Sequence, residues 1–315
     1  MIAFGPVPSR RLGMSLGINN IPPKICTYSC VYCQIGNTLK LDIKRQEFYD
    51  PQEVFESVKE RVEEVQEKGT KIDYLSFVPD GEPTLDLNLG REIELLKNLG
   101  IKIAVITNAS LLWMEEVRRD LMGADWVCVK VDAISRDVFK RVDRPHGRLS
   151  HEQILQGIAR FSGEFKGELV SETMLVKGIN DSEGELEGIA RYLSGLELSR
   201  SYIMVPIRPP AETWAEAPGE DVLNMAYMIF KEYGLKPELL TGAERGSFGF
   251  SGDVVEDILA TSAVHPMRKE SVQELLDKAG KGWDVVQSLI EAGELKEVKY
   301  RGKTFYMRTL RKPDK

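Results

Sequence analysis

The stretch KICTYSCVYCQIGNT, residues 24–38, contains three of the four cysteines of the chain in the spacing C-x3-C-x2-C. Three thiolates can ligate three irons of a cubane [4Fe–4S] cluster, which leaves the fourth iron open to a bidentate small molecule. A structural zinc site is the alternative, but such a site normally has four ligands, and no further Cys or His lies at a suitable spacing nearby. We therefore expect Cys26, Cys30 and Cys33 to be metal ligands.

An aromatic residue, Tyr32, stands directly before the last of these cysteines. The loop thereby resembles the C-x3-C-x-aromatic-C signature of the radical S-adenosylmethionine (SAM) superfamily. In that superfamily the open iron chelates SAM, and an electron from the cluster cleaves SAM to methionine and a 5′-deoxyadenosyl radical, which abstracts hydrogen from a substrate. The resemblance implies a [4Fe–4S] cluster and SAM as cofactors, and a reducing electron donor such as ferredoxin or flavodoxin as a partner.

The segment PDGEPT, residues 79–84, extends the resemblance, because it is similar to the Gly-Gly-Glu segment with which the superfamily binds the methionyl amino group. Gly81 and Glu82 match that pattern, and Asp80 replaces the first Gly. A Gly lets the backbone approach a ligand closely, and a carboxylate or carbonyl can accept from an ammonium group. The alternative is a β/α turn in which the residues after Glu82 begin a helix.

Polar residues also follow or occupy later predicted strands, namely Asn108, Asp132 and Glu172. An amide and a carboxylate can hydrogen-bond the ribose hydroxyls of SAM, although Asn108 could equally cap a following helix. The strand around Glu172 resembles the ribose- and adenine-contacting strand of the superfamily. We expect these residues and Tyr32 to contribute to the SAM site.

The fold class follows from β-branched runs that alternate with amphipathic stretches. The runs that predict buried parallel strands are residues 14–20, 72–78, 101–107, 125–131, 168–176 and 201–207. Between them lie helical patterns such as residues 51–69. About six β/α units predict an α/β fold over residues 1–250, in which the parallel sheet can close into a barrel or stay open, with its chemistry at the carboxyl ends of the strands. Six units favour a partial (β/α)6 TIM-like barrel, and the resemblance implies that it is of the radical SAM type.

A different pattern begins after Gly252 and predicts a small winged-helix domain over residues 251–315. Its expected elements are three helices followed by two basic strands, at residues 253–261, 268–279, 281–292, 294–300 and 303–310. The chain has a formal net charge of −7, but from Glu294 to its end it has eight basic and three acidic residues.

The hairpin expected between these strands is a candidate nucleic-acid contact. Lys299, Arg301 and Lys303 could bind a phosphate backbone, and the interleaved aromatic residues Tyr300, Phe305 and Tyr306 could stack on a base. Many winged helices contact only proteins, so both kinds of partner stay open.

The stretch FGPVPSRRLGMSLGINNIPPKICTYSCVYCQIG resembles radical SAM proteins grouped with the wyosine-base synthases, which build a tricyclic purine in a tRNA; the resemblance spans residues 4–250. The tRNA 4-demethylwyosine synthase of that branch carries a second [4Fe–4S] cluster and uses pyruvate. Here Cys128 is the one cysteine left, so a second all-cysteine cluster is impossible, and an apolar strand predicts a buried packing thiol at this position. An RNA base is a candidate substrate, and another carbonyl- or phosphate-bearing molecule is the alternative.

Two pairs of basic residues are candidates for binding the substrate. Arg10 and Arg11 could meet a carboxylate or phosphate, or be surface arginines paired with acidic helices. Lys130 and Lys177 are candidates for a Schiff-base lysine whose pKa is lowered by burial.

The N-terminus lacks the pattern of a secretory signal, and no run of eighteen apolar residues occurs, so we expect a cytoplasmic protein without membrane insertion. A second hypothesis is an iron–sulfur transcription regulator that binds DNA through the winged helix. It predicts duplex binding with a steep salt dependence and no cleavage of SAM.

Overall fold

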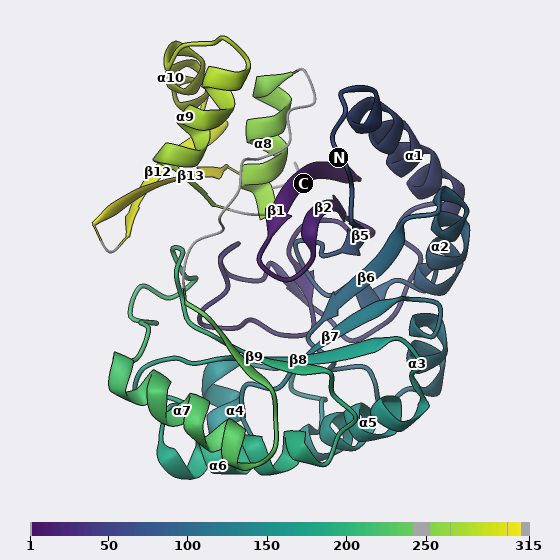
Figure 1. Ribbon diagram of the computed structural model, residues 1–315, viewed down its shortest axis with the longest axis vertical. Coiled ribbons are helices and arrows are strands. Elements are labelled where there is room, and N and C mark those ends of the chain that lie inside the picture. Colours follow the sequence, from purple (N-terminus) through teal and green to yellow (C-terminus); the bar gives the residue numbers. More distant parts are fainter. Residues whose placement is uncertain (1, 242–252, 265, 301, 310–315) are drawn as a thin grey trace.

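The larger part of the computed structural model, which describes residues 2–241, 253–264, 266–300 and 302–309, is built on one curved sheet with helices along its outer side (Figure 1). The strand order is β1-β2-β5-β6-β7-β8-β9-β10; β1 pairs antiparallel with β2, and the other neighbouring strands pair in parallel. The strands are β1 (Ala3–Ser9), β2 (Gly13–Ile18), β5 (Tyr74–Phe77), β6 (Lys102–Thr107), β7 (Trp126–Lys130), β8 (Glu168–Met174), β9 (Arg200–Met204) and β10 (Pro237–Leu240). The carboxyl ends of the parallel strands therefore lie along one edge of the sheet, where side chains from distant segments meet.

All six predicted strands are present, as β2 and β5 to β9. Two further strands, β1 and β10, are the two edge strands of this sheet. The sequence of β1, AFGPVPS, contains two prolines and a glycine, which a strand tolerates at a sheet edge and which hide it from pattern analysis. The four residues of β10 are too few to show a period.

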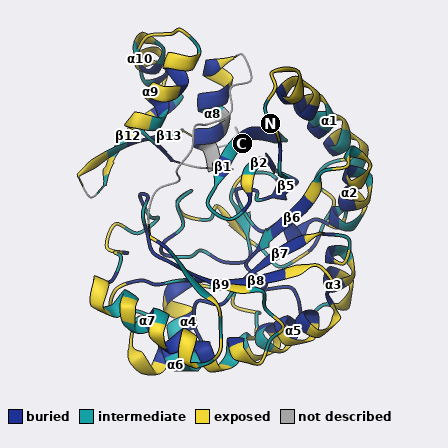
Figure 2. Ribbon diagram, in the orientation of Figure 1, coloured by how far each residue is buried: buried dark blue, intermediate teal, exposed yellow. Residues whose placement is uncertain are grey.

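The helices that cover the outer face are amphipathic, and Figure 2 shows their buried sides turned toward the sheet. They are α1 (Pro51–Glu67), α2 (Leu89–Leu96), α3 (Glu115–Leu121), α4 (Arg136–Val142), α5 (His151–Glu164), α6 (Glu183–Ser194) and α7 (Glu220–Glu232). Helix α1 confirms the prediction for residues 51–69: the Asp50 carboxylate caps it by accepting from the amide of Gln52, and its apolar stripe is buried.

The opposite, inner face of the sheet carries a second apolar cluster. Cys128 is fully buried there, packed among residues that include Ala104, Trp126 and Val170. The prediction that Cys128 is a packing thiol is confirmed, and this cysteine lies apart from the other three.

The C-terminal region contains the predicted order of three helices and a hairpin. Its elements are α8 (Val254–Val264), β11 (Met267–Arg268), α9 (Lys269–Lys278), α10 (Asp284–Glu291), β12 (Leu295–Tyr300) and β13 (Lys303–Arg308), with the strands in the order β11-β13-β12. This order agrees with the expected outline, and the winged-helix assignment itself stays a prediction. The domain boundary expected after residue 250 falls outside the described residues.

A buried ion pair joins this region to the rest of the protein. Nη2 of Arg61, on α1, lies 2.7 Å from Oδ1 of Asp257, on α8, and both side chains are buried. Val7 of β1 also packs against the apolar cluster of the C-terminal region. Among the helices that the structure describes, none is both long and apolar enough to cross a bilayer.

Candidate active site

The three clustered cysteines lie on one loop that begins at β3 (Ile25–Cys26), which pairs with β4 (Lys40–Leu41). Tight turns shape the loop, because the amide of Cys33 donates to the carbonyl of Cys30 at 3.1 Å. The amide of Val31 donates to the carbonyl of Val142 at 3.0 Å, which ties the loop to the end of α4. Its conformation is therefore set both by its own turns and by its contact with the end of α4.

All three cysteines line a single cavity of about 180 Å³, hereafter the cluster cavity. Five of the residues predicted to bind the cofactor line it as well: Tyr32, Asp80, Gly81, Glu82 and Asn108. The remaining two, Asp132 and Glu172, are not among its lining residues. The structure therefore brings together the cysteine loop and the ends of β5 and β6, which are separated in the sequence.

The turn after β5 packs directly on the cysteine-bearing strand. The amide of Lys24 donates to the carbonyl of Asp80 at 2.6 Å, and the amide of Glu82 donates to the carbonyl of Ile25 at 3.2 Å. A Cβ atom added at Gly81 would lie 1.9 Å from the carbonyl oxygen of Ile25. This close approach explains why position 81 holds a glycine.

The Glu82 carboxylate is held mainly by the protein itself. Its Oε1 accepts from the hydroxyls of Thr84 and Thr107, each at 2.6 Å, and Oε2 accepts from the amide of Asn108 at 2.8 Å. It also caps the short 3-10 helix Pro83–Leu85, as the alternative interpretation of this turn expected. Glu82 therefore joins the ends of β5 and β6, and one lone-pair direction on Oε2 is left for a ligand.

The Asp80 carboxylate is the more available acceptor. The side chain is buried, and within the described part of the chain its Oδ1 has no hydrogen-bond partner. Burial raises the pKa of Asp80 from 3.8 to about 7, although the charge of Lys24 opposes the rise. An unpaired buried carboxylate oxygen is costly without a partner, and a ligand ammonium group in the cluster cavity would supply one.

Asn108 lies against the cysteine loop. Its Nδ2 donates to Oγ1 of Thr27 at 2.7 Å and lies 3.6 Å from Sγ of Cys26, and its Oδ1 accepts from the amide of Ser110 at 3.0 Å. Asn108 thus caps a local turn, and it also places an N–H donor on a sulfur that is expected to bind iron. Such donors stabilise negative charge on cluster ligands.

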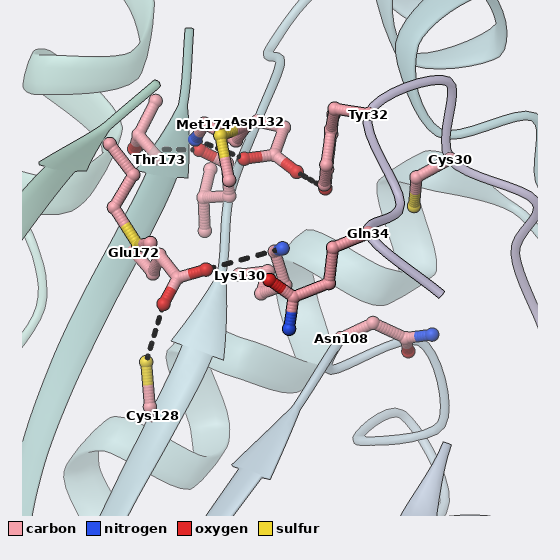
Figure 3. A network of polar contacts seen from close by, with 12 residues as sticks. Cys30, Tyr32, Gln34, Asn108, Cys128, Lys130, Asp132, Glu172, Thr173 and Met174 are labelled. Carbon is pink, nitrogen blue, oxygen red and sulfur yellow. Dashed lines mark hydrogen bonds and ion pairs between the residues drawn. The ribbon is translucent and has the colours of Figure 1, made fainter. Parts of the chain in front are cut away.

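The Asp132 carboxylate contacts the side chain of Tyr32. The Tyr32 hydroxyl donates to Asp132, whose other oxygen accepts from the amide of Met174 at 2.6 Å (Figure 3). This buried carboxylate therefore fixes the aromatic residue next to Cys33, and the expected contact of Asp132 with SAM stays a prediction. Burial, followed by the charge of Asp132, raises the pKa of Tyr32 well above its ordinary value, so the hydroxyl stays a donor.

The Glu172 carboxylate contacts two basic side chains, and its expected contact with SAM stays a prediction. It stands opposite Lys130 in the β7–β8 register, and its Oε1 lies 3.2 Å from Nζ of Lys130 (Figure 3). Arg11 forms an ion pair with the same carboxylate. All three residues line a second cavity of about 260 Å³, hereafter the inner cavity.

The two cavities adjoin each other. Residues that line both are Tyr32, Cys33, Gln34, Val78, Ile106 and Lys130. The shared residues come from the cysteine loop and from strands β6 and β7 and the segment after β5, so these parts of the chain line both cavities.

The two lysines proposed for Schiff-base chemistry have different surroundings. Burial alone lowers the pKa of Lys130, but Asp132, Cys30 and Asp143 raise it above its ordinary value. The lowering of this pKa that the sequence led us to expect is therefore wrong, because acidic neighbours outweigh burial. Lys177 is exposed and lines neither cavity.

The chemistry of the three thiols fits an iron cluster. Burial raises the pKa of Cys26 to about 12, with a further contribution from Glu82, and burial raises the pKa of Cys30 and of Cys33 as well. Bound iron would supply the positive charge that stabilises the thiolate form of these side chains. Within the described residues no group of three or more His, Cys, Asp or Glu side chains surrounds the position of a single metal ion. A cubane differs from such a site because each thiolate takes a different iron.

The nucleic-acid candidates lie on the C-terminal hairpin. Lys299 and Lys303 are exposed, whereas Arg301 lies outside the described residues. The expected stacking by Phe305 and Tyr306 is wrong, because both rings are buried and the Tyr306 hydroxyl donates to Glu297 at 2.8 Å. The rings of Phe305 and Tyr306 pack in the interior of the fold, whereas Tyr300 is half-buried and Lys299 and Lys303 lie on the surface.

Sequence reasoning missed two polar residues of the inner cavity, Gln34 and Arg208. Nη1 of Arg208 donates to Oε1 of Gln34 at 2.8 Å. Each had a detectable signal, because Gln34 directly follows the last clustered cysteine and Arg208 follows the carboxyl end of β9.

Comparison with known proteins agrees with this arrangement. The sequence model of the Radical SAM superfamily matches residues 20–190. The chain is 45% identical to UPF0026 protein MJ1312 of Methanocaldococcus jannaschii over 100% of this chain and 98% of that protein. It is 28% identical to the S-adenosyl-L-methionine-dependent tRNA 4-demethylwyosine synthase of Mus musculus over 39% of this chain and 19% of that protein. The crystal structure of a radical SAM methyltransferase from Sphaerobacter thermophilus superimposes with a TM-score of 0.55 at 17% identity over 74% of this chain and 67% of that chain, a similarity of fold alone.

Proposed function

Because the chain belongs to the radical SAM superfamily and to the UPF0026 family, we propose that Cys26, Cys30 and Cys33 ligate a [4Fe–4S] cluster and that the cluster cavity binds SAM. When bound, the cluster and SAM supply a 5′-deoxyadenosyl radical that abstracts hydrogen from a substrate. The observation that carries the proposal is that three thiols and an unpaired, buried carboxylate oxygen of Asp80 line one cavity.

Each lining residue has a role that its contacts support. Asp80 accepts hydrogen bonds from the ammonium group of SAM, and Gly81 lets the backbone approach the cysteine-bearing strand. Glu82 is a positioning residue that joins the ends of β5 and β6. Asn108 donates to the sulfur of Cys26 and holds Thr27 in place.

The substrate enters from the inner cavity in this proposal. That cavity adjoins the cluster cavity, and apolar side chains such as Phe4 and Met204 line part of it, which limits contact between water and a reactive radical. A base of a tRNA is the substrate to test first, because the Mus musculus relative is named for a reaction on tRNA, and because Lys299 and Lys303 are exposed on the hairpin. Addition of bulk tRNA should then increase the yield of 5′-deoxyadenosine.

The decisive experiment compares two cysteine variants. The full chain is reconstituted anaerobically with iron and sulfide, reduced in the presence of SAM, and assayed for 5′-deoxyadenosine by chromatography. The wild type and Cys128→Ala should form the product, because Cys128 lies apart from the cluster cavity, whereas Cys30→Ala should lose both product and most of its iron. A wild-type protein that holds a [4Fe–4S] cluster but does not bind SAM would contradict the proposal.

The regulator hypothesis makes the opposite prediction of specific duplex binding with no SAM cleavage. Membership in the radical SAM superfamily supports the enzyme instead. A filter-binding titration of duplex DNA at rising salt tests the regulator in the same preparations.

A further inference from the structure

An exposed surface of apolar and basic side chains lies beside the cysteine loop. Leu39, at 59%, is the most exposed of the large apolar side chains that the structure describes, and Leu41 is 40% exposed. Lys40 lies between the two leucines with 54% of its side chain exposed, and the exposed Lys44 follows. We call Leu39, Lys40, Leu41 and Lys44 the loop patch. Single exposed apolar residues are ordinary, but two leucines that flank a lysine in one short segment suit a surface that a partner covers.

The loop patch lies directly against one of the proposed cluster ligands. Strand β4 pairs in parallel with β3, and Leu41 stands opposite Cys26 in this register. The amide of Asp42 donates to the carbonyl of Cys26 at 3.0 Å, and the amide of Lys40 donates to the carbonyl of Lys24 at 3.1 Å. Neighbouring strands lie about 4.8 Å apart, so a residue with exposed apolar surface lies one strand spacing from the backbone of Cys26.

The same segment also forms part of the wall of the cluster cavity. Gly36 and Thr38 line that cavity, and Oγ1 of Thr38 donates to the carbonyl of Tyr28 at 2.7 Å. The next residue along the chain is the exposed Leu39. The chain therefore passes from the cavity wall to the loop patch between one residue and the next.

The charge of this region is opposite in sign to that of the whole protein. Residues 24–46 contain four basic residues and one acidic residue, Asp42, whereas the chain has a formal net charge of −7. One of the four basic residues, Arg45, is buried and forms an ion pair with Asp120. The exposed positive charge of the segment therefore comes from lysines.

Two of these lysines belong to the loop patch. Nζ of Lys40 lies 3.1 Å from Oδ2 of Asp42, and Oδ1 of Asp42 accepts from the amides of Ile43 and Lys44. The Asp42 carboxylate is therefore held within its own turn. Among the ion pairs of the described residues, none involves the side chain of Lys44. Exposed charges of this kind attract a protein of opposite charge and orient it as it approaches.

We propose that the loop patch is the docking surface of a small acidic protein that carries single electrons. Leu39 and Leu41 supply its apolar contact, and Lys40 and Lys44 face the acidic side chains of the carrier. Its small size suits a transient complex, because interfaces between electron-transfer partners typically bury less than about 1,200 Å².

The inference rests on the proposed function, which supplies the electron acceptor at Cys26, Cys30 and Cys33. The reduced carrier loses one electron and the cluster gains it, and this transfer forms and breaks no covalent bond. The pairing of Leu41 with Cys26 places the docked carrier close to a cluster ligand, and electron transfer is faster over shorter distances.

The test measures by calorimetry how oxidised carrier proteins bind the reconstituted full chain at low salt, since salt screens contacts between exposed charges. The probes are an acidic flavodoxin, an acidic ferredoxin and, as a control of opposite charge, a basic cytochrome c. Flavodoxin or ferredoxin should bind, and their affinity should fall as salt rises, whereas cytochrome c should not bind.

Two variants of the loop patch separate its charge from its apolar contact. Lys44→Glu should raise the dissociation constant of the acidic carrier about tenfold or more, because it sets like charges against each other. Leu39→Gln should raise it about fivefold or more, because it removes apolar area from the interface. The matched controls are Lys166→Glu and Met122→Gln, since both residues are exposed and directly precede the amino ends of β8 and β7, at the opposite edge of the sheet.

Each outcome decides the inference. It is overturned if neither acidic carrier binds, if cytochrome c binds equally well, or if both patch variants weaken binding no more than their controls. Patch variants that weaken the binding of bulk tRNA but not of the carriers would assign the surface to RNA and also overturn it. Lys44→Arg keeps the charge and should bind like the wild type, which shows that the effect of Lys44→Glu does not come from misfolding.

A parallel assay separates this inference from the proposed function. SAM cleavage by the wild type is measured with dithionite, a small reductant that needs no docking surface. Carrier binding that depends on the loop patch, in a protein that does not bind SAM, would support the docking surface and contradict the proposed function. Cleavage of SAM with dithionite in a protein that binds no acidic carrier would support the proposed function and overturn the inference.

Discussion

Gly81 and Ile25 approach each other so closely that a Cβ atom on Gly81 would lie 1.9 Å from the carbonyl oxygen of Ile25. Ile25 directly precedes the first clustered cysteine, and Gly81 lies in the turn after β5. The contact therefore sets how the cysteine loop sits on the end of the sheet.

Gly81→Ala should displace the cysteine loop. Crowding of this kind typically costs about 1–3 kcal/mol of stability, and we expect the variant to retain much less iron after reconstitution than the wild type. The measurements are the free energy of unfolding in urea and the iron content. The matched control is Gly184→Ala, whose Cβ on α6 would contact nothing within 4 Å and should leave iron content unchanged. Equal iron content in both variants would show that the contact does not position the loop.

Asp80→Asn should weaken SAM binding without loss of iron. The substitution removes the negative charge that we assign to the ammonium group of SAM, and hydrogen bonds between charged groups contribute about 1.5–3 kcal/mol, which corresponds to roughly tenfold or more in the dissociation constant. Equilibrium dialysis with SAM measures the change. Asp137→Asn, at an exposed position of α4, is the control. An unchanged affinity would remove Asp80 from the SAM site.

In the protein without iron and SAM, the difference in stability between Asp80→Asn and the wild type should depend on pH. Burial raises the pKa of Asp80 from 3.8 to about 7, so between these values the folded protein keeps a proton that the unfolded chain releases. Wild-type stability therefore falls as the pH rises through this window, and the loss is complete above about pH 7. Relative to the wild type, Asp80→Asn should gain about 2–3 kcal/mol between pH 5 and pH 7 in urea unfolding. A difference that is constant with pH would contradict the raised pKa.

Loss of one partner of the Arg61–Asp257 pair should destabilise the attachment of α8 to α1. Both side chains are buried, and removal of one member of such a pair typically costs about 3–5 kcal/mol because a buried charge loses an ion-pair partner. Arg61→Met should therefore lower the urea midpoint and increase proteolysis near the C-terminal region. The double variant Arg61→Met/Asp257→Leu should recover much of the loss. The control is the exposed pair Arg91–Glu94, because Arg91→Met should change the free energy of unfolding by less than about 1 kcal/mol. No recovery in the double variant would argue against an electrostatic cause.

Local patterns predicted the parts of the site that lie close together in the sequence. The cysteine spacing placed three thiols on one loop, and the position of Gly81 and Glu82 directly after a strand placed them at the reactive edge of the sheet. Asp132 and Glu172 were also correctly placed near strand ends, yet their side chains bind other parts of the protein. Their partners, Tyr32 and Arg11, come from distant segments of the chain. Strand patterns do not predict which distant segments lie next to Asp132 and Glu172.

The sequence by itself determined the cysteine loop, six parallel strands and the polar residues that follow them, because thiol spacing and the periods of helices and strands are local properties of the chain. Only the tertiary structure decided that Arg10, Arg11 and Arg208 converge with Lys130 on one cavity. Their positions depend on strand order, on register and on the turn of an edge strand that carries two prolines. Convergence of like charges depends on long-range packing, which no local period encodes.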